Sequence, residues 1–129
     1  MIVGVGVDLV DTVRFDEQLR RTPKLLERLF RPEERELKVR SLAARFAAKE
    51  AFVKALGNSK GFGFQDLLIS GGGDEQPRLV LLAGALEAAN ARGVSSIHLS
   101  ISHDGVHAMA FVVIEGEMPL QNAQEIQNG

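Results

Sequence analysis

Apolar residues recur with a helical period between residues 41 and 57, the longest such segment of the chain. The segment is rich in Ala, Leu, Lys, Arg and Glu, and its interior contains neither Gly nor Pro. Ser41 is suited to cap its start, and Gly57 is suited to end it. We therefore predict one long helix, whose apolar stripe consists of Leu42, Phe46, Val53 and Leu56.

Charged residues interrupt this stripe. Lys49 lies inside it, and Glu50 and Lys54 lie along its edge. Either these groups only flank the core, or they enter a functional site. Because Glu50 and Lys54 stand at positions i and i+4, they can also form a simple surface ion pair, worth about 0.3–0.5 kcal/mol. Two interpretations stay open for Lys49: it pairs with a carboxylate at a site, or it extends to solvent.

The first ten residues read as a strand with apolar residues on both faces. Gly4, Gly6 and Asp8 share one of these faces. Glycine weakens a strand unless another backbone or a ligand comes close, so the two glycines can clear space beside Asp8. The alternative is that Asp8 merely ends the strand and caps the following helix.

Turn and cap signals divide the rest of the chain into short elements. Three short helices are predicted next: one from Asp11 or Thr12 to about Arg21, one that restarts at Thr22-Pro23, and one after Arg31-Pro32 with Glu33 and Glu34 in its first turn. After the long helix we predict strands at 64–70 and 78–82, a helix at 83–92, and strands at 95–103 and 106–115 joined by Asp104-Gly105. A two-residue turn there pairs His103 with Val106. Residues 116–129 are polar and lack periodicity, so we expect a disordered tail.

This order of elements predicts an α+β fold, with a largely antiparallel sheet packed against one long helix and several short helices. A chain of 129 residues suits a single domain, which we assign to residues 1–115. The chain contains no cysteine, so disulfides and thiolate metal sites are excluded. No signal peptide or membrane-spanning run is visible, and the net charge of −2 gives no indication of nucleic-acid binding. We therefore expect neither a membrane nor a nucleic acid as partner.

Positive charge is concentrated in one part of the chain. Residues 14–40 contain nine Lys/Arg and six Asp/Glu, a local balance of +3 in an acidic protein. Such a surface can bind an anionic partner, or it can be an ordinary mixed-charge face in solvent. The basic residues that we expect to point outward are Arg14, Arg20, Arg21, Lys24 and Arg28.

Few kinds of catalytic chemistry fit these residues. The three histidines form no H-E-x-x-H zinc motif, and neither a nucleophile elbow nor a Walker loop occurs. Asp8 and Glu50 remain as two carboxylates suited to Mg²⁺, which binds one or two carboxylates together with phosphates. The Gly-rich turn at 57–63 can approach a phosphate, although plain flexible loops share this composition. His103 ends a strand on its core face, where a hydrogen-bonded structural histidine is common.

Three ordered segments stand out: Gly4-Val-Gly-Val-Asp8-Leu-Val, Arg45-Phe-Ala-Ala-Lys49-Glu50-Ala-Phe-Val-Lys54-Ala-Leu, and Leu99-Ser-Ile-Ser-His103. Together they resemble holo-acyl-carrier-protein synthase, the small bacterial type of phosphopantetheinyl transferase, from Met1 to about Glu115. The resemblance implies that family's fold and its reaction, in which the phosphopantetheine of coenzyme A moves to a serine of apo-acyl carrier protein and adenosine bisphosphate leaves. It also implies a cytoplasmic enzyme of fatty acid biosynthesis, and a homotrimer with active sites between subunits.

The resemblance also implies roles for individual residues. Asp8 and Glu50 would bind Mg²⁺, and Glu50 would help remove the serine proton. Lys54 would contact the pyrophosphate, and Arg45 and His103 would contact the nucleotide end of coenzyme A. The acidic carrier protein would meet the basic surface formed by Arg14, Arg20, Arg21, Lys24 and Arg28.

The turn after the long helix departs from the family pattern, which often has a Gly-Thr-Gly-type loop. Only the first glycine of Gly57-Asn-Ser-Lys-Gly-Phe-Gly63 is kept, and Lys60 could replace the missing phosphate contacts by its charge. Two alternatives to the transferase follow. One is a non-catalytic module that binds coenzyme A or acyl carrier protein, and the other is a metal-dependent phosphate-ester hydrolase.

Overall fold

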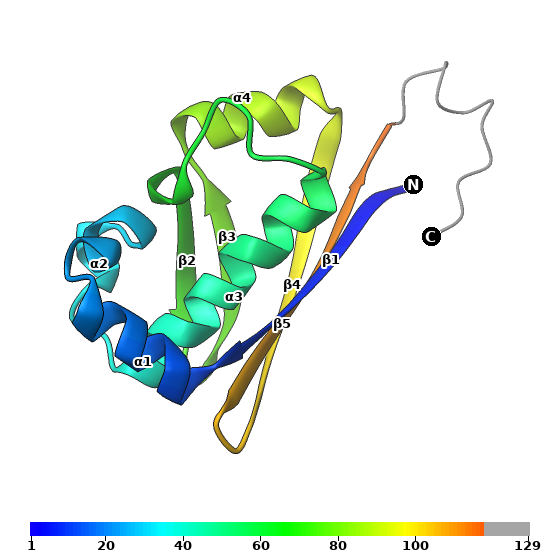
Figure 1. Ribbon diagram of the computed structural model, residues 1–129. Helices are drawn as coiled ribbons and strands as arrows, with labels where there is room; N and C mark the ends of the chain where they lie inside the picture. The colour runs from blue at the N-terminus through cyan, green and yellow to red at the C-terminus, as the bar shows by residue number, and fades with distance from the viewer. Residues whose placement is uncertain (118–129) are drawn as a thin grey trace.

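The computed structural model describes residues 1–117. Within this range, one antiparallel sheet has the strand order β1-β5-β4, and β2 and β3 form a second one. The longest helix, α3 (Val39–Leu56), packs against the three-stranded sheet, and the β2-β3 hairpin lies beside β4 (Figure 1). The strands are β1 (Ile2–Asp11), β2 (Leu67–Gly72), β3 (Glu75–Leu81), β4 (Val94–Asp104) and β5 (His107–Gly116). The predicted α+β class is confirmed.

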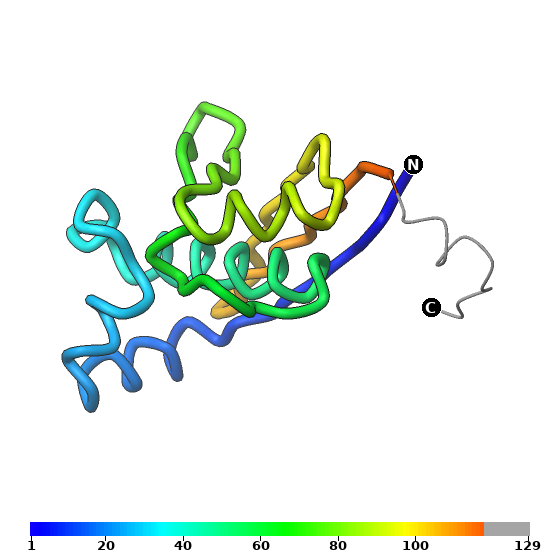
Figure 2. The backbone as a smooth tube through the Cα atoms, turned by 90° about the horizontal axis from the view of Figure 1, so that it is seen from above, coloured from blue at the N-terminus to red at the C-terminus, as the bar shows by residue number. Residues whose placement is uncertain are grey.

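Shorter helical segments surround this centre. They are α1 (Thr12–Arg21), α2 (Lys24–Leu29), the 3₁₀ turns η1 (Pro32–Glu34) and η2 (Phe64–Asp66), and α4 (Ala83–Ala91). Figure 2 shows α1 and α2 at one end of the molecule and Met1 at the other, where its amino group donates to the Gly116 carbonyl at 3.2 Å. The third short helix predicted from sequence, after Arg31-Pro32, is only the single 3₁₀ turn η1. In this turn the Glu34 carboxylate accepts a hydrogen bond from the Arg31 backbone N–H at 3.0 Å.

The long helix begins earlier than its sequence signals indicate. Lys38 precedes its first residue with an extended backbone, and the Lys38 carbonyl accepts the Leu42 N–H at 3.0 Å. Ser41 therefore lies inside the helix, and its prediction as N-cap is wrong. The predicted end is confirmed, because Gly57 follows the last helical residue with a φ of 104°, a left-handed conformation that favours glycine.

The buried surface of α3 is wider than the predicted stripe. Leu42 and Leu56 are buried as expected, but Phe46 and Val53 are only partly buried. Phe52 and Lys49 are fully buried in their place, together with Ala43, Ala44, Ala47, Ala48, Ala51 and Ala55. Small side chains on several sides let the helix sit deep in the core, where a single stripe of large residues does not describe its packing.

Two glycines of β1 allow this helix to approach closely. A Cβ added at Gly4 would lie 2.0 Å from the carbonyl oxygen of Ala55, and one at Gly6 would lie 2.0 Å from that of Ala51. The space cleared by the glycines is thus filled by the backbone of α3. Because Asp8 lies next along the same face, α3 is brought directly over it.

The predicted pairing of the last hairpin is wrong in register. Asp104 pairs with His107, so Gly105 and Val106 form the loop, and His103 pairs with Ala108. This pairing differs from the predicted one by two residues, which leaves every side chain on its predicted face.

Other boundaries differ by a few residues. Phe64–Asp66 form η2, so the strand predicted from residue 64 begins at Leu67. The pairing of Gly72 with Glu75 also shortens the connection between the strands predicted at 64–70 and 78–82. Of the predicted tail, Gly116 belongs to β5, and residues 118–129 lie outside the described part of the chain.

Candidate active site

Asp8 faces α3 and is held there by a lysine. The Lys54 ammonium donates to Asp8 Oδ1 at 3.1 Å and to the Val7 carbonyl at 3.0 Å. Asp8 does not cap the following helix, because Asp11 does so by accepting the Arg14 N–H at 3.0 Å. Of the two interpretations left open by the sequence, the geometry favours Asp8 as a site residue.

Glu50 shares a pocket with Asp8. Burial raises the pKa of the Glu50 carboxyl, the negative charge of Asp8 raises it further, and Lys54 opposes both. The surface ion pair between Glu50 and Lys54 that spacing allows is absent among residues 1–117, since Lys54 pairs with Asp8 instead. The structure therefore brings together three of the predicted site residues, two carboxylates and one lysine.

This pocket opens toward the basic helices. Besides the two carboxylates it is lined by Arg14, Phe15 and Gln18 of α1. A neighbouring pocket also contacts Phe15, Gln18 and Glu50, and it continues along the side chains of Arg21, Thr22, Leu25 and Arg28. One groove thus leads from the carboxylates to α1 and α2.

The predicted basic surface is partly neutralised within α1. Arg20 lies 2.8 Å from Asp16, and Arg21 lies 3.9 Å from Glu17, both at the i, i+4 spacing. Arg14 lines the carboxylate pocket, and Arg28 lines its continuation. Lys24 begins α2 and is exposed.

Arg45 and His103 lie together, but in a different pocket. The Arg45 guanidinium donates through Nη2 to the Gly71 carbonyl at 3.1 Å, and His103 Nδ1 accepts a hydrogen bond from Arg40 at 3.3 Å. Burial and the positive charge of Arg40 lower the pKa of His103. This pocket is also lined by Ser41 and the 71–73 glycines, and it shares no residue with the carboxylate pocket.

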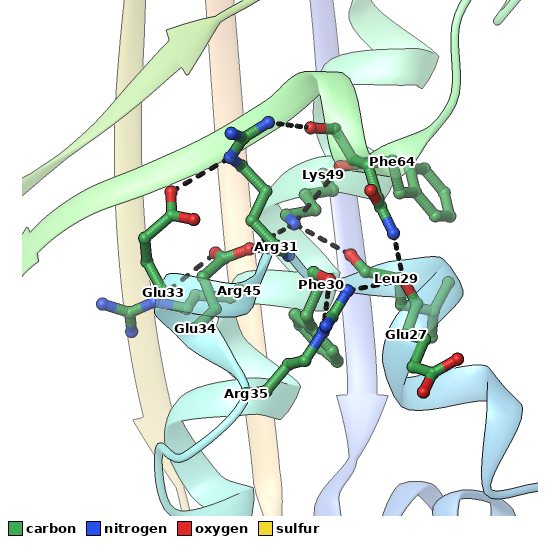
Figure 3. A network of polar contacts seen from close by, with 11 residues as sticks. Glu27, Leu29, Phe30, Arg31, Glu33, Glu34, Arg35, Arg45, Lys49 and Phe64 are labelled. Carbon is green, nitrogen blue, oxygen red and sulfur yellow. Dashed lines mark hydrogen bonds and ion pairs between the residues drawn. The ribbon is translucent and has the colours of Figure 1, made fainter.

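Lys49 contacts neither pocket. Its ammonium is fully buried and lies 2.7 Å from Glu34, a residue that sequence reasoning did not assign to any site (Figure 3). The sequence signal was the position of Lys49 inside an apolar stripe, since a buried lysine requires a carboxylate partner. Arg40, which bonds to His103, also went unpredicted, and no sequence signal pointed to it.

The carboxylate pocket fits a magnesium ion in its donor chemistry. Residues 1–117 contain no group of three or more His, Cys, Asp or Glu side chains that could hold a metal by themselves. Two carboxylates that line one pocket are nevertheless sufficient for Mg²⁺, which keeps several waters and takes further oxygens from substrate phosphates. Asp8 and Glu50 are the residues that could hold it. Among the described helices, none is long and apolar enough to cross a membrane.

Comparison with known proteins decides the family. The family model described as the 4'-phosphopantetheinyl transferase superfamily matches residues 4–112. The chain belongs to this superfamily. It is 51% identical over 119 residues to the holo-[acyl-carrier-protein] synthase of Clavibacter michiganensis subsp. michiganensis, covering 92% of this chain and 100% of that one. This phosphopantetheinyl transferase is therefore an enzyme, as the resemblance in its motifs predicted.

Solved structures agree with this assignment. Helicobacter pylori holo-[acyl-carrier-protein] synthase in complex with coenzyme A aligns with a TM-score of 0.74 and 34% identity, over 86% of this chain and 99% of that one. The enzyme of Bacillus anthracis in complex with coenzyme A (3',5'-ADP) aligns with a TM-score of 0.72 and 33% identity, over 91% and 99%. The phosphopantetheinyl transferase-like fold predicted from sequence is confirmed.

Proposed function

We propose that this phosphopantetheinyl transferase moves the phosphopantetheine group of coenzyme A to a serine hydroxyl of an apo-acyl carrier protein and releases adenosine 3',5'-bisphosphate. The observation that carries the proposal is that Asp8 and Glu50 line one pocket and that Lys54 pairs with Asp8 there. The names of the relatives support the reaction, and the coenzyme A complexes of two solved relatives support the donor.

Asp8 and Glu50 would hold Mg²⁺ in this enzyme. When bound, the ion would offset negative charge on the pyrophosphate as the phosphoryl group is transferred. Lys54 neutralises Asp8 in the free protein, and 54% of its side chain is exposed. A flexible ammonium in this position can turn toward the pyrophosphate and stabilise the leaving oxygens.

Glu50 is also suited to accept the proton of the attacking serine. Burial and the Asp8 charge raise the pKa of Glu50 in the metal-free protein, and a bound Mg²⁺ would keep this carboxylate deprotonated and able to accept a proton. The groove from Glu50 to Arg14 and Arg28 gives the acceptor a route to this carboxylate. The acidic carrier would bind the basic surface of Arg14, Arg20, Arg21, Lys24 and Arg28.

The two separate pockets support a site shared between subunits. Arg45 and His103 would bind the nucleotide end of coenzyme A, but they line a pocket that has no residue in common with the Asp8 pocket. An arrangement in which one subunit supplies the carboxylates and its neighbour supplies Arg45 and His103 would unite them. We therefore propose a homotrimer with active sites between subunits. We also propose that it is located in the cytoplasm.

An exposed apolar sheet face supports this assembly. It consists of side chains on the side of β1 and β5 opposite α3, namely Val5, Val7, Leu9, Met109 and Phe111, which are all exposed in the single chain. A contiguous apolar face of this kind marks an interaction surface. Static light scattering of the purified protein tests the trimer, and a monomer at all concentrations would contradict it.

The reaction itself is tested by incubating the protein with coenzyme A and an apo-acyl carrier protein, with Mg²⁺ or with a chelator. We expect adenosine 3',5'-bisphosphate to be released in equal amount to modified carrier, and only when the metal is present. Calorimetric binding of coenzyme A without any product would instead identify a non-catalytic binding module. Release of phosphopantetheine without a carrier would identify a hydrolase.

A further inference from the structure

Glu34 is a buried carboxylate placed between two cations of α3. Its side chain is 2% exposed, and Oε1 lies 2.7 Å from Lys49 Nζ and 3.0 Å from the backbone nitrogen of Arg31. The other oxygen, Oε2, lies 3.8 Å from Arg45 Nε (Figure 3). One carboxylate thus neutralises a lysine with one oxygen and faces an arginine with the other.

Lys49 has no capacity left for a substrate. Its three ammonium hydrogens have three acceptors: the Leu29 carbonyl at 2.8 Å, Glu34 Oε1 at 2.7 Å and the Phe64 carbonyl at 3.3 Å. Burial lowers the pKa of Lys49, and Glu34 opposes this effect. Lys49 therefore ties α2, η1 and η2 to α3, and its role is structural.

Arg45 differs from Lys49 because it reaches the surface of a pocket. Its side chain is 14% exposed and lines the cavity that also contains His103. Nη2 donates to the Gly71 carbonyl at 3.1 Å. Nε and Glu34 Oε2 are both buried, and within the described residues neither makes a hydrogen bond, so each is left facing the other.

We propose that Glu34 is a positioning residue, which fixes the Arg45 guanidinium in the orientation that binds the nucleotide end of coenzyme A. The proposal rests on the proposed function of the Arg45 pocket. A free arginine loses rotamer entropy when it binds a phosphate, and a side chain that is already fixed avoids this loss. Glu34 supplies the opposite charge at Nε while Gly71 holds Nη2, which leaves the remaining guanidinium N–H groups for the ligand.

The sharpest test compares Glu34→Gln with Lys49→Met. Glu34→Gln removes the negative charge that faces Arg45. Lys49→Met removes the other cation beside Glu34 and keeps the negative charge of Glu34. Calorimetry with adenosine 3',5'-bisphosphate should show about tenfold weaker binding for Glu34→Gln and for Arg45→Ala. The double variant Glu34→Gln/Arg45→Ala should bind no more weakly than Arg45→Ala alone, because both changes remove one interaction. Lys49→Met should bind as the wild type does.

A purely structural role for Glu34 gives a different pattern. Glu34→Gln and Lys49→Met would then weaken binding equally, or the effects of Glu34→Gln and Arg45→Ala would add in full. Either result would overturn the proposal. If Lys49→Met does not fold, the double variant Glu34→Gln/Lys49→Met replaces it in the binding comparison, because it removes both charges of the buried pair. It should bind as weakly as Glu34→Gln.

A second measurement does not depend on the proposed function. The Arg45 Nε–H should exchange slowly with solvent in nuclear magnetic resonance spectra of the wild type and of Lys49→Met, and rapidly in Glu34→Gln. Unchanged exchange in Glu34→Gln would contradict the positioning role. If the wild type does not bind adenosine 3',5'-bisphosphate, the proposed nucleotide pocket fails, and the exchange rate still decides whether Glu34 positions Arg45.

Discussion

The Lys54 ammonium bonds to Asp8 Oδ1 at 3.1 Å and thereby joins α3 to β1 at the carboxylate pocket. This contact is possible because the glycines of β1 admit the backbone of α3. The same approach places Glu50, one turn earlier on the helix, in the pocket with Asp8. The close packing of one strand and one helix therefore builds the proposed catalytic group.

Gly6→Ala should damage both stability and activity. The new Cβ would lie 2.0 Å from the Ala51 carbonyl oxygen, so the helix has to move away from β1. We expect a loss of about 1–3 kcal/mol in the free energy of unfolding, together with reduced transfer. Gly63→Ala is the matched control, because its Cβ meets nothing within 4 Å, and urea denaturation should show little change. Equal stability for the two variants would contradict this account of the packing.

Lys54→Met should reduce transfer about tenfold or more, because it removes the charge that balances Asp8 and reaches the pyrophosphate. Steady-state kinetics with coenzyme A as the varied substrate measures the effect. The exposed Lys38, changed to Met in the same way, is the control. The role assigned to Lys54 is wrong if the two variants retain the same activity.

The raised pKa of Glu50 predicts a pH-dependent stability. In metal-free protein the folded state keeps a proton on Glu50 above the usual pKa of 4.5, where the unfolded chain releases it. Stability should therefore fall as the pH rises from this value through the raised pKa. Glu50→Gln lacks that loss, so the difference in free energy of unfolding between this variant and the wild type should shift in favour of the variant as the pH rises above 4.5. Urea denaturation in the presence of a chelator measures the free energy of unfolding of both proteins. A difference that stays constant with pH would show that the pocket does not raise the pKa of Glu50.

Lys49→Met should be strongly destabilising, because it leaves the buried Glu34 carboxylate without its closest cation. A loss of about 3–5 kcal/mol in the free energy of unfolding is expected. Glu34→Gln/Lys49→Met should recover part of this loss, since no uncompensated charge remains. Chemical denaturation of the three proteins checks the order, and a double variant less stable than Lys49→Met would contradict it.

Mixing two impaired variants tests the proposed site between subunits. Glu50→Gln and Arg45→Ala would each impair every site in a homotrimer. When the two chains are refolded together, some sites combine an intact Glu50 from one chain with an intact Arg45 from its neighbour. Transfer activity should therefore reappear in the mixture, and a mixture no more active than its separate components would place both residues in one subunit.

The sequence predicted which site residues lie together better than it predicted their surroundings. Asp8, Glu50 and Lys54 were identified from their motifs, and the structure brings them together. The partner of Lys49 was missed because Glu34 lies fifteen residues away in a turn whose shape depends on tertiary contacts. Ser41 was misplaced as a cap because helix propensity does not reveal that the first turn already begins at Val39.

Packing was harder to predict for a physical reason. Alanine fits both buried and exposed helix positions, so a pattern of large apolar residues identified Phe46 and missed the buried Phe52. The separation of Arg45 and His103 from the carboxylates was also unpredictable, because motif order along a chain carries no information about which pocket each motif faces.

The mass of an apo-acyl carrier protein after incubation with coenzyme A and Mg²⁺ tests the central claim most directly. With the wild-type enzyme we expect the carrier to gain the mass of one phosphopantetheine, located on a serine. With a folded Glu50→Gln enzyme we expect transfer to be slower by a factor of about 100 or more. An unmodified carrier with the wild type, or equal rates for the two enzymes, would contradict the proposed active site.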